Sequence, residues 1–169
     1  LEGLQRTFPR RVREEWRMVA LSTGLFGGPL LLSIVALALD PSLVYTLIDP
    51  MTVANVEMMY DPASEQFLRE RSAETDIEMF GFYIRNNIGI GFRVFASGLL
   101  AGLGSAFFLA YNGLVIGAVI GHLRNVGFAE TLYPFMIAHG AFELTAIVLA
   151  GAAGLRLGSA LVCLLYTSD

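Results

Sequence analysis

The chain has 169 residues, of which 55% are hydrophobic and 15% are charged, and its formal net charge is −4. A soluble domain of this length could not hide so much apolar surface from water, so the composition predicts a membrane protein. The acidic balance argues against nucleic acid as a partner, because that ligand needs a basic face. The single cysteine, Cys163, excludes an internal disulfide and a cysteine-built metal site.

The chain begins with a basic segment, residues 1–18, which precedes an uncharged apolar stretch. By the positive-inside rule, its five arginines predict a cytoplasmic amino terminus: Arg6, Arg10, Arg11, Arg13 and Arg17. Residues 19–39 then form the predicted first transmembrane helix, because about 20 apolar residues are needed to cross a bilayer.

Residues 40–85 have the composition of an extracytoplasmic loop. Between Asp40 and Glu78 they hold nine acidic residues against two arginines. Val53, Val56, Met59 and Tyr60 recur at helical spacing, so we expect short helices on the outer membrane surface.

Residues 86–161 form the predicted membrane core. The apolar stretch from Ile88 to Leu123 is too long for one crossing, and the Asn-Gly pair at 112–113 predicts a turn within it. This places a second helix at Ile88–Ala110 and leaves Leu114–Leu123 as a short segment that either crosses the membrane or is re-entrant. Further helices are predicted at Leu132–Ala153 and Leu155–Leu165.

The overall prediction is an all-α, multi-pass transmembrane helical bundle with a short helix and an acidic outer loop. The chain begins without methionine, and its last apolar run stops short of membrane length. We therefore expect a fragment, with residues 162–169 as a truncated or foreign end.

Glycines recur four residues apart, which places two of them on one helix face. This spacing favours close helix packing in a membrane, with a gating hinge as the alternative. Besides Gly24 and Gly28, the residues concerned are Gly98, Gly102, Gly113, Gly117, Gly121, Gly154 and Gly158.

His139 and Glu143 lie four residues apart on one predicted membrane helix. An ionisable pair there is costly unless each member finds a partner, so it is a candidate functional site. A hydrogen bond between the two would make the pair purely structural, whereas a polar site for a small ion or solute would make it functional. The candidate interior polar cluster comprises Asn86, Asn87, Arg93, Asn112, His139 and Glu143.

A zinc site is a third alternative for this pair, with His122 as the remaining histidine ligand. The spacing lacks the adjacent glutamate of the HExxH pattern, which supplies a general base. We therefore expect no catalytic residue, no metal and no cofactor, and an intramembrane metal-dependent hydrolase is the least favoured reading.

Four ordered motifs run from Phe82 to Ile88, Phe95 to Gly102, Asn112 to Gly117 and His139 to Ala146. Together they resemble the stage II sporulation protein M family. The amino-terminal stretch from Phe8 to Arg17 also resembles the variant found in non-sporulating bacteria. The resemblance implies a protein of the bacterial cytoplasmic membrane without an established enzymatic activity, and it assigns no roles to the motif residues.

Taken together, these inferences predict a non-catalytic scaffold or assembly partner for cell-envelope machinery. The expected partners are the lipid bilayer and other membrane or cell-envelope proteins, a second copy of the chain included. A transporter or channel-like component with its polar site at His139 and Glu143 is the alternative.

Overall fold

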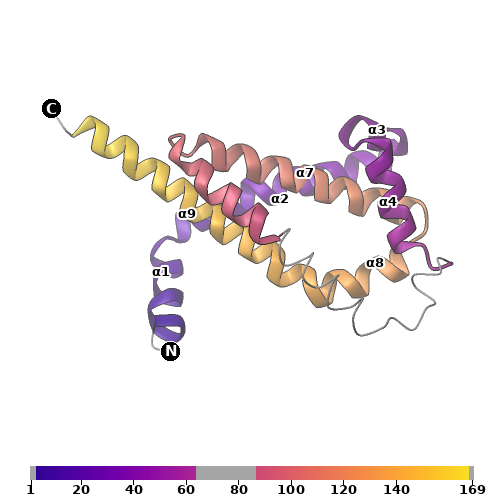
Figure 1. Ribbon diagram of the computed structural model, residues 1–169, viewed down its shortest axis with the longest axis horizontal. Coiled ribbons are helices and arrows are strands. Elements are labelled where there is room, and N and C mark those ends of the chain that lie inside the picture. Colours follow the sequence, from indigo (N-terminus) through magenta and orange to yellow (C-terminus); the bar gives the residue numbers. More distant parts are fainter. Residues whose placement is uncertain (1–2, 64–86, 168–169) are drawn as a thin grey trace.

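The computed structural model describes residues 3–63 and 87–167, and this part of the chain is helical and contains no strand. Three of its helices are long and apolar enough to cross a membrane: α2 (Trp16–Leu39), α7 (Leu103–Asn125) and α9 (Ala141–Tyr166) (Figure 1). The prediction of an all-α bundle is confirmed. The shorter elements are η1 (Gly3–Thr7), α1 (Phe8–Glu14), η2 (Pro41–Leu43), α3 (Val44–Leu47), α4 (Pro50–Tyr60), η3 (Ser97–Leu99), α8 (Ala129–Phe135) and η4 (Met136–Gly140).

Helices α2 and α7 lie side by side and run in the same direction (Figure 1). Gly113 packs on Phe26, and one turn later Gly117 packs on Leu30. Helix α9 runs the opposite way: the Ser22 hydroxyl of α2 donates to the carbonyl oxygen of Val148 at 2.7 Å, whereas Arg156, later in α9, donates to Glu15, which precedes α2. The bundle therefore contains two parallel long helices and one antiparallel helix.

The chain must return between the two parallel helices, and the last part of this return is a helix over residues 87–96. It ends in η3 and a tight reversal, where Ala101 and Gly102 have φ angles of 54° and 82°. Glycine adopts such positive φ angles without steric cost, whereas alanine does so rarely. The predicted continuous helix Ile88–Ala110 is therefore wrong, since the chain reverses at residues 97–102.

The turn predicted at Tyr111–Gly113 is also wrong, because α7 continues through it and Leu114–Leu123 is no separate short segment. The Asn112 amide donates to the Phe108 carbonyl of the preceding turn, at 2.6 Å, and this bond is compatible with a helix. Gly113 serves close packing on Phe26 and not a change of chain direction.

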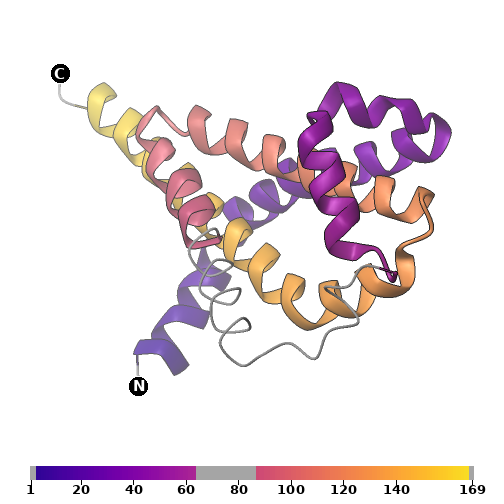
Figure 2. The ribbon, with the colours of Figure 1, turned by 45° about the vertical axis from the view of Figure 1, so that its right-hand side comes forward.

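Helix α9 is preceded by α8 and η4, and the path bends at this point (Figure 2). Pro134 lies inside α8, and the next turn, η4, is a π-helix. Proline removes a backbone donor, and π-turns accommodate such interruptions. Beyond the bend, α9 continues through Gly154, so the separate helix predicted from Leu155 is not present.

Residues 40–61 form a cap over the ends of α2 and α7. Asp40 and Asp49 accept hydrogen bonds from the backbone N–H groups of Ser42 and Thr52, and so begin η2 and α4. The side-chain hydrogen bond from Thr52 is the main reason that the pKa of Asp49 lies below its ordinary value. The helix α4 includes Val53 and Tyr60, where the sequence pattern predicted a short helix.

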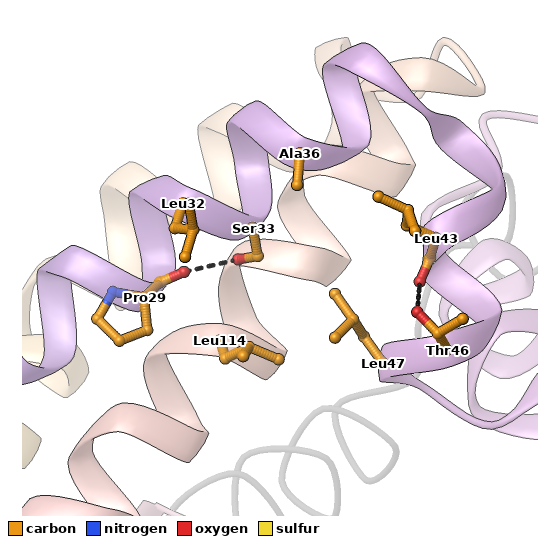
Figure 3. Close-up of a pocket in the computed structure, with 8 residues that line it drawn as sticks. All are labelled: Pro29, Leu32, Ser33, Ala36, Leu43, Thr46, Leu47 and Leu114. Carbon is orange, nitrogen blue, oxygen red and sulfur yellow. Dashed lines mark hydrogen bonds between the residues drawn. The ribbon is translucent and has the colours of Figure 1, made fainter.

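The cap is attached to the long helices by a buried apolar cluster made of Leu37, Val44, Ile48, Val53 and Ala118. Beside it, a shallow apolar groove of about 160 Å³ lies between α2, α3 and α7. Figure 3 shows that the hydroxyl groups at its edge are bonded inside their own helices, Ser33 to the Pro29 carbonyl and Thr46 to the Leu43 carbonyl. The groove therefore offers apolar surface and few free polar groups.

Candidate functional site

A cavity of about 240 Å³ lies where α7, α9, the helix over residues 87–96 and the bend at η4 meet. Tyr60 of the cap closes one side of it. Most of its wall is aliphatic, and the lining residues are Tyr60, Asn87, Ile90, Val115, Ile116, Val119, Ile120, Leu132, Met136, Gly140, Glu143 and Leu144.

Two members of the predicted polar cluster, Asn87 and Glu143, line this cavity from different helices. Glu143 lies in the first turn of α9, where the helix dipole favours a negative charge. The carboxylate is half-buried, and within the described part of the chain no hydrogen bond or ion pair reaches it. The cavity can thus present one carboxylate and one amide to a small polar guest.

His139 lies in the π-turn η4, whose last residue, Gly140, lines the cavity. The position of the His139 side chain is outside what the structure describes, as is the whole of Asn86. A π-turn widens the helix locally, and such turns occur often at functional sites. The backbone therefore places the His139–Glu143 segment at the cavity wall.

The two remaining members of the predicted cluster lie elsewhere. Arg93 is exposed on the helix over residues 87–96. The amide of Asn112 is bonded within α7 and does not line the cavity. Among the described residues, no group of three or more histidine, cysteine or acidic side chains is placed to hold a metal ion.

A buried polar contact, separate from the cavity, joins the cap to α7. The Nε2 atom of His122, a residue that is 7% exposed, lies 2.6 Å from Oε1 of Glu57 on α4. Sequence reasoning assigned Glu57 to a solvated acidic loop and did not predict this pair. The available signal was His122 itself, because a histidine in an apolar helix requires a polar partner.

The seven glycines predicted at helix contacts all lie at close approaches between segments. Gly113, Gly117 and Gly121 face α2, whereas Gly154 and Gly158 face the reversal that contains Gly98 and Gly102. Gly24 and Gly28, the remaining pair with this spacing, have no neighbouring atom within 4 Å of a Cβ built on them. Gly151 is a further contact, with a Cβ position 2.6 Å from Leu109 and 2.7 Å from the Ser22 hydroxyl.

The family model of stage II sporulation protein M matches residues 19–169. The chain belongs to this family. The match includes α2, α7, α9, the cap and the whole cavity, and it begins after α1. With three helices of membrane-spanning length and composition, this family member is a membrane protein. Comparison with curated proteins and with solved structures gave no match.

Proposed function

We propose that this chain is a multi-pass protein of the bacterial cytoplasmic membrane that acts as a non-catalytic scaffold or assembly partner for cell-envelope machinery. The proposal rests on family membership, on the three apolar helices and on the difference between the packed side and the exposed side of the cap. In this arrangement the membrane helices hold the cap in place, and the cap presents a surface to partners.

The charge distribution supports a cytoplasmic amino terminus and an extracytoplasmic cap. The end of the bundle at which α2 begins carries Arg6, Arg10, Arg11, Arg13, Arg17 and Arg156. The opposite end is mainly acidic, with Asp40, Asp49, Glu57, Asp61 and Glu130 against Arg124. In membrane proteins, the segments that lie on the cytoplasmic side carry an excess of arginine and lysine.

The observation that carries the proposal is the difference between the two sides of the cap. One side is fixed by the buried cluster around Val44 and by the contact between Glu57 and His122. The other side exposes large side chains on α3 and α4: Tyr45 is 58% exposed, Met51 75% and Met58 54%. Exposed methionine and tyrosine on a rigid support are typical of protein-binding surfaces.

A photo-crosslinking amino acid at Met51 or Met58 is expected to form adducts with a cell-envelope protein in bacteria that carry the natural partners. The matched control is Val35, which is 55% exposed on the apolar helix α2 and should give adducts with lipid. Adducts would be identified by mass spectrometry. An inserted protein that forms no protein adduct from either cap position, or forms adducts only with its own copies, would contradict the proposal.

A transporter or channel-like component is the second candidate, and the cavity at Glu143 is the observation that favours it. Polar groups in apolar cavities between membrane helices are common at substrate and ion sites. The cavity volume of about 240 Å³ has room for a small solute.

The two candidates differ in the flux that they predict for the parent and for Glu143→Gln and His139→Ala. If the protein is a scaffold, both variants insert normally and keep their cap crosslinks, and parent proteoliposomes conduct no solute or ion. If it is a transporter, the parent shows a flux that Glu143→Gln abolishes while cap crosslinks persist. Glu130→Gln removes one negative charge, as Glu143→Gln does, but at an exposed position on α8. It is the control in both assays.

A further inference from the structure

A third concave site, a groove, lies at the arginine end of the bundle, between the first two α-helices and α9. Its volume is about 290 Å³. Each wall follows a helical face with spacings of three and four residues: Phe8, Arg11, Val12, Glu15 and Val19 on one side, and Leu149, Ala152, Ala153 and Arg156 on the other. Ala152 is buried and Val19 and Leu149 are half-buried, whereas the two arginines are exposed.

Charge at this end is strongly positive. At this end, the described residues before α2, the start of α2 and the later half of α9 contribute six arginines against Glu14 and Glu15. Glu14 is shared between Arg10 and Arg11, at 3.3 and 3.1 Å, so one carboxylate faces two cations. The groove therefore has a net attraction for an anion.

Arg156 has spare hydrogen-bonding capacity at the groove. Its Nε atom donates to Oε1 of Glu15 at 3.0 Å, and among the described residues this is the one hydrogen bond of its guanidinium. A guanidinium carries five N–H donors, so its terminal nitrogens are available for a phosphate group. The side chain is 56% exposed and can be reached from outside the groove.

The groove also lies where lipid headgroups meet hydrocarbon. Trp16, at the junction of α1 and α2, is 61% exposed, and Phe8 on α1 is 51% exposed. Exposed aromatic residues next to arginines and at the start of an apolar helix mark the membrane interface. Figure 2 shows α1 diverging from the bundle at this junction, beside α9.

We propose that this groove binds one anionic phospholipid. The phosphodiester contacts Arg156 and Arg11, and an acyl chain packs along Val19, Leu149 and Ala153. Basic pockets between membrane helices bind such headgroups, and the apolar floor matches the attached chain. The α1 side of the groove lies outside the matched residues 19–169, so the site depends on this chain's own first segment.

The test is a lipid titration of the detergent-solubilised chain, followed by native mass spectrometry. Phosphatidylglycerol is expected to bind more tightly than phosphatidylcholine, and Arg156→Gln should weaken phosphatidylglycerol binding about fivefold, the effect of one arginine near an anionic headgroup. Arg13→Gln, the same change at an exposed residue outside the groove, should bind like the parent. Equal binding of the two lipids, or equal loss in both variants, would overturn the proposal.

Two further variants separate a lipid site from a purely structural ion pair. Glu15→Gln frees the Arg156 guanidinium and is expected to strengthen phosphatidylglycerol binding, whereas weaker binding in this variant would count against the site. Ala153→Phe fills the groove without changing charge and should weaken binding. It tests the site independently of whether Arg156→Gln folds.

Inorganic phosphate alone is expected to leave the melting temperature unchanged. A stabilisation equal to that by phosphatidylglycerol would exclude a lipid-specific site.

Discussion

Replacing Gly113 or Gly117 by alanine is expected to lower the free energy of unfolding by about 2–3 kcal/mol each, the upper part of the range for overpacking. A methyl group at Gly113 would overlap the Phe26 carbonyl oxygen, and one at Gly117 would overlap the Leu30 carbonyl oxygen and the Ser33 hydroxyl. Backbone atoms cannot rotate away, so α2 and α7 must separate. Thermal unfolding of the purified protein in lipid nanodiscs measures the loss.

The matched control is Gly24→Ala, on the side of α2 where nothing approaches within 4 Å. There, alanine should be neutral or stabilising by up to about 1 kcal/mol, because it favours the helix more than glycine does. Gly121→Ala should fall between these results, since its nearest neighbour is the Leu37 Cβ at 3.1 Å. If Gly24→Ala and Gly117→Ala had the same effect, the close packing of α2 on α7 would be refuted.

Replacing His122 by alanine is expected to loosen the attachment of α4 to α7 and to cost about 1–3 kcal/mol, because it removes a buried imidazole and its hydrogen bond to a carboxylate. The imidazole is 7% exposed and lies 2.6 Å from the Glu57 carboxylate. Hydrogen exchange should rise across α4, whereas α9, which takes no part in this contact, should stay protected. The cap should stay attached, because the apolar cluster around Val44 still joins it to the bundle.

A double-mutant cycle of His122→Ala and Glu57→Ala distinguishes this contact from general loss of packing. The double variant should be less destabilised than the sum of the two single variants, because either change alone already breaks the contact. Glu130→Gln removes a negative charge from the same end of the bundle and should leave exchange in α4 unchanged. Strict additivity would mean that the histidine and the glutamate do not interact.

The sequence predicted the fold class and the first membrane helix well. Residues 19–39 were expected and Trp16–Leu39 is observed, because an uncharged run of this length bounded by Arg17 and Asp40 has few alternatives. The reversal at residues 97–102 was missed because it is apolar and rich in small residues, like the helix contacts. Gly102 has both roles, since it adopts a positive φ and lies against Gly158.

The candidate site was predictable only in part. Glu143 stood out as an acid in an apolar helix, and the structure places it at a cavity together with Asn87. The pairing of His122 with Glu57 depends on how α4 packs on α7, which is set by the apolar cluster that contains Val53 of α4 and Ala118 of α7. Such contacts join segments far apart in the chain, and no local pattern reveals them.

The reversal at residues 97–102 also sets an order of events during synthesis. Its close contacts are with Gly154 and Gly158 of α9, which leave the ribosome several seconds later at about 5–20 residues per second. Until then, the helix over residues 87–96 and the start of α7 lack the surface against which they pack. Ribosome-bound chains that stop before α9 should therefore hold α7 beside α2 while the reversal stays open to proteases.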